Sequence, residues 1–484
     1  MAANTLEQLS SSDDSQADAN NSQRGAMTDD RKLTLGTVLL GFLLTGCVAQ
    51  TSLSDRRDAV TLNLEVEANR QLAVRYRSRE PTLALHFSQE LGGYRAEVWQ
   101  PAQTGFRWVT EGDGERVERI DGKPFDRLSF TVPIDYRALP KSYGPFSPFS
   151  DGSTLIHSGQ FHTCLRARCE GTAPLPTTIE APGSTIGVEG RRLQYRASFV
   201  SREEGTNIFV GKLEPIETDG FIAVIDPGLP SELRAHLDRS LPQSMEFYAA
   251  IYGPLSFKPE LYVSIDDRPE RNGHFSTQGG TLPNQVFMHF DGENARERLA
   301  TQNNLWLDWF FAHEAALLFQ QDKVGSLASD DVAAWIHEGG ADAMAALALV
   351  GRGSAERSYV VNREREAEAA CGKGLTDAPL DRATAEDNFD LHYQCGLVIW
   401  LALDQDLRRS GRDGLNSLNQ FFFAAVRAGE TWSEATFLKV ARQHGVSQSL
   451  IAQIISLSRG DYADATMAIE EVGRLARQSL ETRE

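Results

Sequence analysis

The chain has fewer basic than acidic side chains. The 48 lysines and arginines stand against 67 aspartates and glutamates, which gives a net charge of −19. A surface of that sign repels phosphates, so the sequence predicts no nucleic-acid partner.

Sequence motifs of several enzyme classes are also missing. A Gly-x-Ser-x-Gly elbow is absent, so a serine hydrolase is unsupported. Gly372-Lys373-Gly374 lacks the Ser or Thr and the spacing of a phosphate loop. No repeat of fixed period is present, which argues against repeat architectures.

Cysteine is also scarce, with five residues in the 484. Cys47 follows the apolar run of a leader, which leaves Cys164, Cys169, Cys371 and Cys395. Four cysteines in an exported protein allow two disulfides in three pairings. Closeness in sequence favours the pairs Cys164 with Cys169 and Cys371 with Cys395. Four free buried thiols are the alternative.

The leader holds a long apolar run. This run, residues 33–46, has 14 residues and is too short for a bilayer, which needs about 20. Arg31 and Lys32 precede it, as in a secretory signal peptide. Its end, Leu44-Thr45-Gly46-Cys47, resembles a bacterial lipoprotein signal, and a plain signal peptide is the alternative. The resemblance implies that a signal at residues 27–46 is removed and that Cys47 takes a lipid.

The residues around the lipidation signal bear on where the protein is placed. Val48 follows Cys47, whereas the inner-membrane retention signal of such lipoproteins is usually an aspartate. The resemblance therefore implies an outer-membrane anchor, with the chain facing the periplasm. Residues 47–59 are expected to be a tether. Residues 1–26 are rich in Ser, Asp and Asn, so we expect them to be disordered, or a misassigned start if Met27 begins the chain.

The remaining length and the 41% hydrophobic content predict two folded domains. Between residues 60 and 215, short alternating segments separated by turn residues predict an antiparallel β-sandwich. Residues 220–460 form the second domain. It has strands at 221–225, 261–265 and 284–290, a helix at 231–252 capped by Ser231, and then mostly helices. Residues 461–484 are expected to be a C-terminal tail.

A helix predicted at residues 306–320 carries His313-Glu314-Ala315-Ala316-Leu317. In a helical His-Glu-x-x-His, positions i and i+4 share a face, so both histidines bind one zinc ion and the glutamate activates its water. His313 and Glu314 are in place, but Leu317 occupies the second histidine position and cannot bind a metal. Alone, such a pair more often marks a buried histidine and its partner.

The next helix, capped by Asp330 and Asp331, carries Trp335-Ile336-His337-Glu338-Gly339-Gly340-Ala341-Asp342. This segment resembles the gluzincin metallopeptidases, in which Trp-x-x-Glu-Gly supplies the third zinc ligand. Twenty residues separate Leu317 from Glu338, close to the spacing of that family. The resemblance implies that Glu338 is a metal ligand and that Asp342 holds a ligand histidine in place.

A third segment, from His392 to Asp404, resembles the Tyr-x-Lys-Gly helix of gluzincin aminopeptidases, and of the glycyl aminopeptidase branch in particular. It implies that Tyr393 stabilises the oxyanion of the tetrahedral intermediate. Cys395 replaces the lysine of that motif. The resemblance covers about residues 60–460. It implies a multidomain α+β fold, in which an N-terminal β-sandwich precedes a thermolysin-like domain with a small mixed sheet and a helical C-terminal lobe.

Two hypotheses follow from the incomplete motif. In the first, the zinc site is degenerate, and the cleft binds a peptide or protein along the strand at 284–290 without cleaving it. Glu314 and Tyr393 then persist as buried polar groups. In the second, the chain is an active zinc peptidase with Glu314 as general base and a substitute ligand. The histidines considered for that ligand are His274, His289, His337 and His392. Neighbours on a helix point about 100° apart, which disfavours His337 beside Glu338.

Overall fold

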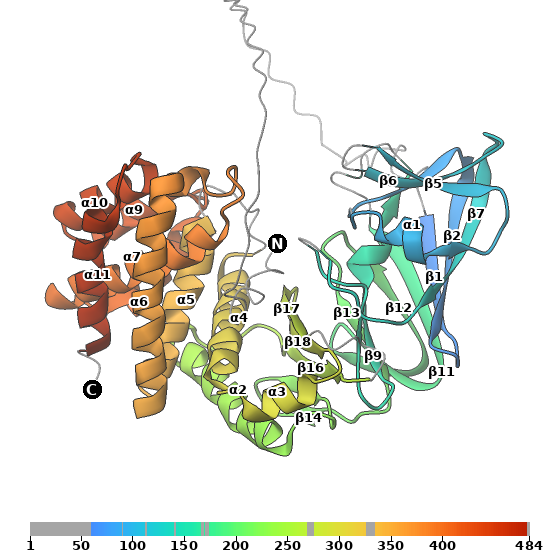
Figure 1. Cartoon of the computed structure of the whole chain (residues 1–484), viewed down its shortest axis with the longest axis horizontal. Helices are drawn as coiled ribbons and strands as arrows, with labels where there is room; N and C mark the ends of the chain where they lie inside the picture. Colours follow the sequence, from blue (N-terminus) through green and yellow to red (C-terminus); the bar gives the residue numbers. More distant parts are fainter. Residues whose placement is uncertain are drawn as a thin grey trace, which may run out of the picture.

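The computed structural model describes residues 60–481, apart from residues 90, 112–113, 140–141, 166–168, 170–173, 269–274 and 326–333. The predicted leader, Cys47 and the tether lie outside these residues, as do Asp330, Asp331 and His274. The described chain is a mixed α+β structure. A β-rich N-terminal part, a central sheet and a helical C-terminal lobe follow one another along the molecule (Figure 1). None of the described helices is both long and apolar enough to cross a membrane.

A nine-stranded sheet makes up most of the β-rich part, in the order β4-β7-β2-β1-β11-β13-β9-β8 with β12 paired to β11. Its strands alternate between buried and exposed side chains, because successive side chains of a strand point to opposite faces. The strands are β1 (Val60–Val66), β2 (Gln71–Thr82), β4 (Gln100–Pro101), β7 (Phe125–Pro133), β8 (Phe146–Pro148), β9 (Thr154–His157), β11 (Leu175–Val188), β12 (Arg191–Ser201) and β13 (Asn207–Gly211).

A four-stranded sheet in the order β10-β3-β6-β5 packs on the first and completes a sandwich. Aromatic rings fill the space between the sheets, and Trp108 of β5 stacks on Phe130 of β7 with ring centroids 5.4 Å apart. Strands β1 and β11 pair in parallel, so the sandwich is mixed, where the alternating pattern predicted an antiparallel one. The elements are β3 (Ala84–Phe87), β5 (Phe106–Glu111), β6 (Gly114–Arg119), β10 (Thr163–Cys164) and the short helix α1 (Tyr94–Val98).

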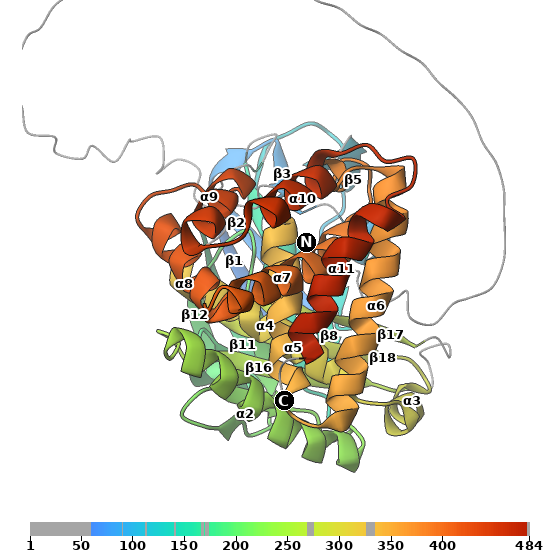
Figure 2. The same ribbon diagram turned by 90° about the vertical axis from the view of Figure 1, so that its left-hand side faces the viewer.

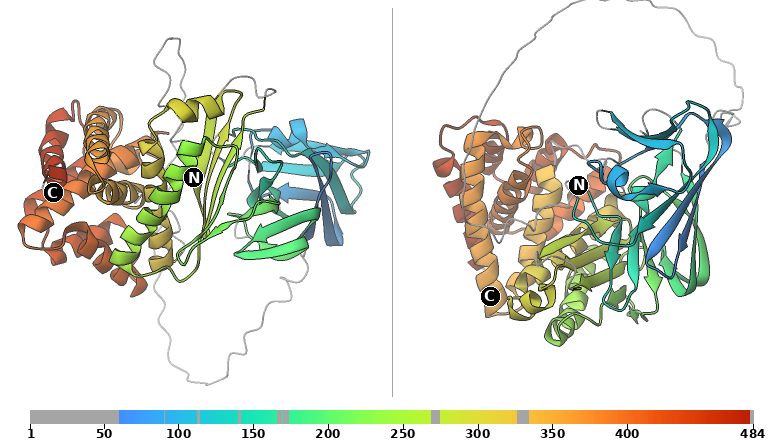
Figure 3. Two further views of the ribbon diagram at one scale, coloured as in Figure 1. Left: turned by 90° about the horizontal axis from the view of Figure 1, so that it is seen from below. Right: turned by 45° about the vertical axis from the view of Figure 1, so that its right-hand side comes forward.

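The central sheet has five strands in the order β14-β15-β16-β18-β17, with helices on one side and the β-rich part on the other (Figure 3). Strands β15, β16 and β18 run parallel, while β14 and β17 pair antiparallel at the edges. The strand predicted at 284–290 is β18, which is interior, so the predicted peptide edge is wrong: β17 is the edge strand. The elements are β14 (Ile216–Glu217), β15 (Ile222–Ile225), β16 (Glu260–Asp266), β17 (Ser276–Leu282), β18 (Gln285–Asp291), α2 (Ser231–Tyr252) and α3 (Ala295–Thr301).

Helix α2 has the predicted bounds, but its N-cap residue is Pro230, and Ser231 is the first helical residue without a capping side-chain bond. The helix ends at Gly253, which has a φ of 78°. Glycine reaches this left-handed region with little strain, so it ends the helix where the sequence predicted.

The C-terminal lobe consists of eight described helices. Residues 461–484, predicted as a tail, contain helix α11, which lies beside α6 and α7 (Figure 2). Ile469, Val472 and Ala476 are buried on one face of α11, so this segment completes the core. The helices are α4 (Leu305–Val324), α5 (Ala334–Val350), α6 (Ser354–Asp377), α7 (Asp390–Arg409), α8 (Gly414–Arg427), α9 (Glu434–His444), α10 (Gln448–Arg459) and α11 (Thr466–Glu481).

Both disulfides join the cysteines that closeness in sequence favoured. Cys164 bonds to Cys169 in the β-rich part, and Cys371 bonds to Cys395, which links α6 to α7.

Buried polar contacts fix the β-rich part against the central sheet. The Gln285 side chain accepts a hydrogen bond from the Asn207 amide at 2.7 Å and donates one to the Asn207 carbonyl at 2.9 Å. The Asp226 carboxylate accepts hydrogen bonds from Ser150 and from two amides of its own domain, including that of Ile265 at 3.1 Å. Buried groups of this kind are costly to leave unpaired. The two parts are therefore expected to hold one fixed arrangement.

Helix α6 buries a carboxyl group that makes stability depend on pH. Glu364 is fully buried, its oxygens make no hydrogen bond to a described residue, and Arg477 lies 3.8 Å away. Burial raises the pKa of Glu364 from its ordinary 4.5 to about 7, against the attraction of Arg477. The unfolded chain releases this proton first, so the wild type loses stability as the pH rises from about 4.5 to about 7.

Glu364→Gln should remove this loss. The variant is expected to be more stable than the wild type at pH 8 by on the order of 2 kcal/mol, and to show little or no gain at pH 4.5. Urea unfolding at the two pH values measures the difference. Glu366→Gln, an exposed change on the same helix, is the control and should change stability by less than about 0.5 kcal/mol. An equal effect of Glu364→Gln at both pH values would contradict the assignment.

Candidate functional site

Helices α4 and α5 bring together three of the residues that the motif singled out. His313 of α4 is 6% exposed, and its Nδ1 lies 2.8 Å from Asp342 Oδ1 of α5. Its Nε2 lies 3.3 Å from Glu338 Oε2, one turn earlier on α5. The Trp309 indole donates to the same Asp342 oxygen at 2.8 Å. Asp342 therefore holds the ring of His313, which is the role that the resemblance implied for it.

The electrostatics of this trio favour the charged form of His313. Burial lowers the pKa of His313, but the Asp342 and Glu338 carboxylates outweigh burial and hold that pKa well above its ordinary value. Burial raises the pKa of Glu338, but hydrogen bonding to His313 and nearby positive charge lower it to about 2. The His313 ring thus lies between two carboxylates, and buried charged groups need opposite charges of this kind in order to remain ionised.

His313 and Glu338 occupy two of the three zinc-ligand positions at the distance expected of two zinc ligands. Leu317 occupies the third position and has no atom that can bind a metal. Two ligands of a tetrahedral zinc ion, each about 2.0–2.1 Å from it, lie about 3.3–3.4 Å apart. His313 Nε2 and Glu338 Oε2 match this at 3.3 Å. Leu317, one turn after His313, is 6% exposed and packs in the core. Among the described residues no group of three His, Cys, Asp or Glu side chains is placed to hold an ion. The donor set therefore does not fit a three-ligand zinc site.

The histidines considered as substitutes are engaged elsewhere. His337 Nδ1 lies 2.8 Å from the Gln320 side-chain oxygen, and its Nε2 is 4.0 Å from Glu338 Oε1. His392 Nε2 bonds to the Thr384 hydroxyl at 3.0 Å, and burial lowers the pKa of His392 to about 4. His289 bonds to Ser264 inside the central sheet. His289 and His392 thus bond to residues outside the pair of His313 and Glu338, whereas His337 reaches Glu338 at 4.0 Å. His274 lies outside the described residues.

Glu314, the predicted general base, faces the edge of the central sheet. Its carboxylate accepts a hydrogen bond from the Thr281 hydroxyl on β17. Burial raises the pKa of Glu314 to about 7, although charged His313 and the Thr281 hydrogen bond oppose it. A carboxyl group with that pKa can exchange a proton near neutral pH, which is what a general base needs.

Tyr393 and Cys395 both lie on helix α7 but have different contacts. The Tyr393 hydroxyl hydrogen-bonds to Glu338, and its ring centroid lies 5.8 Å from that of His313. Tyr393 thus lies beside the pair of His313 and Glu338. Cys395, at the lysine position of the family, is fully buried and bonded to Cys371. It replaces a charged group with a covalent link between helices.

The structure adds two residues that the sequence did not indicate. Thr281 lies near the end of β17, directly after Gly279-Gly280, in a segment for which the sequence predicted no strand. Tyr143 comes from the β-rich part, where its ring packs on Phe287 with centroids 5.0 Å apart. Its hydroxyl lies over Gly280, where a Cβ atom would overlap with it. Threonine in an alternating strand pattern was a usable signal for Thr281, whereas no sequence signal connects Tyr143 to this site.

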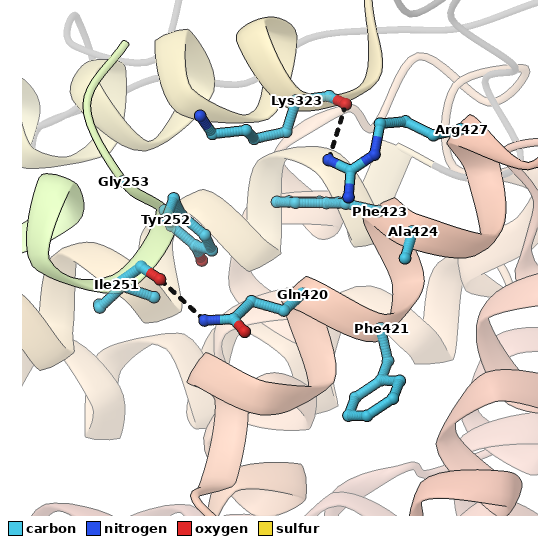
Figure 4. A pocket seen from close by; sticks show the side chains of 9 residues that line it. All are labelled: Ile251, Tyr252, Gly253, Lys323, Gln420, Phe421, Phe423, Ala424 and Arg427. Carbon is cyan, nitrogen blue, oxygen red and sulfur yellow. Dashed lines mark hydrogen bonds between the residues drawn. The ribbon is translucent and has the colours of Figure 1, made fainter.

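A separate pocket lies between the end of α2 and helices α4 and α8 (Figure 4), with a volume of about 510 Å³. Tyr252 and Phe423 form its wall, and Lys323 and Arg427 lie at its edge. Arg427 donates to the Lys323 carbonyl at 3.3 Å, and Lys323 donates to the Pro254 carbonyl at 3.3 Å. Cations near helix C-terminal carbonyls stabilise those helix ends. The two charges thus have a structural use, and the pocket's lining includes none of His313, Glu314, Glu338 and Tyr393.

Comparison with known proteins supports the fold. No protein-family model and no curated protein matches the sequence. Among solved structures, an aminopeptidase N family protein from Idiomarina loihiensis aligns with a TM-score of 0.59 and 11% identity, over 85% of this chain and 78% of that one. An M1 zinc metallopeptidase from Deinococcus radiodurans, a mutant bound to a Tyr-Ser-Ala substrate, aligns with a TM-score of 0.46 and 16% identity, over 84% and 94%. The predicted fold class is confirmed: the chain has the multidomain α+β fold of aminopeptidase N-like metallopeptidases.

Proposed function

We propose that this protein is a membrane-anchored lipoprotein with a degenerate peptidase site, whose cleft binds a peptide or protein without cleaving it. The observation that carries this proposal is Leu317, a buried aliphatic side chain at the second zinc-histidine position. Removing an outer-shell partner of a metal typically costs 10–100-fold in affinity or activity, so losing a direct ligand is expected to cost more. The glycyl-aminopeptidase-like character of the α7 segment gives the type of peptidase from which the site derives.

The cleft keeps the features that hold a peptide backbone. Strand β17 pairs on one side with β18 and, within the described residues, pairs with no strand on the other. An edge strand presents a row of backbone groups to which an extended peptide can add as a further strand. Thr281 and Gly280 of β17 lie beside Glu314 and Tyr143. A bound chain along β17 would therefore pass the old catalytic residues.

Leu317→His is expected to restore zinc binding. The substitution supplies a second imidazole one turn from His313, on the helix face that meets Glu338. After dialysis against trace zinc, elemental analysis should find close to one zinc per chain in the variant and essentially none in the wild type. Leu318→His is the matched control, because Leu318 is also fully buried on α4 but points about 100° away. It should bind no zinc.

The same measurement decides between the two hypotheses. One zinc per wild-type chain, together with peptide hydrolysis that vanishes in Glu314→Gln, would mean that a substitute ligand completes the site and the chain is an active zinc peptidase. In that case His313 and Glu338 bind the metal, and Glu314 and Tyr393 act as base and oxyanion donor. The engagement of His289 and His392 with other residues supports the degenerate site instead.

The anchor is the second part of the proposal. Leu44-Thr45-Gly46-Cys47 supports lipidation of Cys47, and Val48 supports retention in the outer membrane on its periplasmic side. Mass spectrometry of the N-terminal peptide from the purified membrane fraction should find a lipid on Cys47. A mature chain that begins at another residue, without lipid, would indicate a plain signal peptide.

A further inference from the structure

Arginines gather on the outer face of the nine-stranded sheet, which points away from the four-stranded sheet. Arg75, Arg77 and Arg79 alternate along β2 and are exposed, while Tyr76 and Ser78 between them are buried. Arg127 of β7 is exposed directly opposite Arg77 in the antiparallel register. These strands lie at the end of the molecule farthest from the helical lobe (Figure 1).

The pair formed by Arg77 and Arg127 lacks compensation in the folded chain. Like charges directly opposite each other on one sheet face destabilise the sheet. Elsewhere on this face arginines are neutralised: Arg75 lies 2.7 Å from Glu65, and Arg196 lies 3.4 Å from Glu180. Neither Arg77 nor Arg127 makes an ion pair with any residue in the described ranges. The chain has a net charge of −19, so two neighbouring arginines without acidic partners form a positive patch on an acidic protein. An anionic partner would explain this patch.

The position of this face in the chain indicates which anion it meets. Thr61, at the start of the first described strand, is paired with Arg77. Twelve residues separate Cys47 from Val60, and twelve residues span at most about 40 Å. If Cys47 carries the lipid, the bilayer surface stays within that reach of Arg77 and Arg127. The inference therefore rests on the anchor of the proposed function.

We propose that Arg77 and Arg127 dock this sheet face on the phosphates of anionic lipid headgroups in the membrane that holds the anchor. Arginine matches phosphate with several donors, and a basic residue near an anionic surface contributes attraction that salt weakens. Docked in this way, the β-rich end meets the membrane, while the helical lobe extends away from it. The fixed arrangement of the two parts then keeps the cleft off the bilayer.

The test follows the distance between this face and the lipid. The mature lipidated chain, with Thr131→Cys on the same face of β7 labelled with a fluorophore, is reconstituted into vesicles that contain a headgroup quencher. One vesicle set is phosphatidylcholine, and the other is equal parts phosphatidylcholine and phosphatidylglycerol. We expect stronger quenching on the anionic vesicles. Arg77→Gln with Arg127→Gln should lower the ratio of docked to undocked chain about 30-fold, about fivefold for each arginine.

A matched control changes two arginines that already have acidic partners. Arg191 pairs with Glu189 and Arg196 with Glu180, so Arg191→Gln with Arg196→Gln should leave the quenching unchanged. Equal quenching on both lipids, or unchanged quenching in the Arg77 and Arg127 variant, overturns the docking. Release by inorganic phosphate beyond that by chloride of equal ionic strength would indicate a soluble anion site and also overturns it. Failure of the anchor is measured separately by the mass of the N-terminal peptide. A histidine-tagged chain on nickel-chelating lipid then repeats the docking test without the lipid on Cys47.

Discussion

Glu115→Ala is expected to destabilise the protein by about 4 kcal/mol, because it leaves a fully buried guanidinium without its counter-charge. Arg95 is 0% exposed and Glu115 is 2% exposed, and the two side chains form an ion pair between α1 and β6. Burial lowers the pKa of Arg95, and Glu115 opposes that shift most strongly. Arginine nevertheless keeps its proton at working pH, so the variant must bury an unpaired charge.

The neighbourhood of Arg95 leaves little room for relaxation. Its guanidinium also donates to the carbonyls of Gln89 at 2.7 Å and Gln160 at 2.8 Å, and it lies 4.5 Å from the ring of Phe87. These contacts hold the side chain in place when Glu115 is lost. Replacing both partners by apolar residues should cost much less than removing one, because no charge then stays buried. Arg95→Met combined with Glu115→Leu tests that statement.

Urea unfolding of the variants measures these differences, and an exposed pair in the same part of the chain serves as the control. Arg137 and Glu97 lie 2.9 Å apart with side chains 49% and 60% exposed. Glu97→Ala should cost less than about 1 kcal/mol, because water screens and replaces an exposed ion pair. Similar losses from Glu115→Ala and Glu97→Ala would show that burial does not set the value of the inner pair.

Local pattern was sufficient to predict individual elements of this fold. The apolar spacing and Gly253 placed α2 at its observed bounds. The apolar run around His313 placed α4, and the segment around Glu338 lies on α5 as predicted. These elements depend on contacts between residues close in sequence. The helical repeat brings such residues together whatever the rest of the chain does.

Features set by distant residues were missed for physical reasons. The parallel pairing of β1 with β11 joins residues more than 100 apart, and the alternating pattern contains no information on which strand lies beside which. Strand β17 contains Gly279 and Gly280, which suggest a turn. They are strand residues here because Phe310 and Tyr143 occupy the space that side chains would fill. Residues 461–484 were predicted to be a tail. The apolar face of α11 packs on α6 and α7, which are distant in sequence, so local pattern did not reveal these contacts.

The candidate site also contains residues that the sequence indicated and contacts that it did not. His313 was singled out by the helical His-Glu motif, and Glu338 and Asp342 by the resemblance of their segment to gluzincins. The sequence also showed the loss at Leu317. It did not show that Thr281 holds Glu314, that Tyr143 reaches the cleft from the other domain, or that His337 and His392 are engaged by Gln320 and Thr384. Each of these contacts joins elements whose relative placement is decided by the whole core.

Gly339→Ala is expected to destabilise the lobe by about 3 kcal/mol and to separate Glu338 from His313. Helices α5 and α7 meet backbone to backbone here, and a Cβ atom on Gly339 would overlap with the Cα of Gly396. A Cβ on Gly396 would in turn lie 2.6 Å from the Cα of Gly339 and 2.8 Å from the Trp335 carbonyl. The obstructing atoms belong to backbone, which cannot rotate away, so the helices must move apart at the cost of overpacking.

Zinc affinity, measured where the chain is folded, tests the position of Glu338 separately from the loss of stability. Glu338 precedes Gly339 on α5, so a shift of this helix changes the 3.3 Å separation between Glu338 and His313. In the Leu317→His background, Gly339→Ala should weaken zinc binding at least tenfold at temperatures where the chain remains folded. Gly351→Ala is the control, because a Cβ at Gly351 meets no atom within 4 Å. It should leave both stability and zinc binding unchanged. Full zinc affinity in the Gly339 variant would mean that the glycine contact packs the helices without setting the spacing of the site.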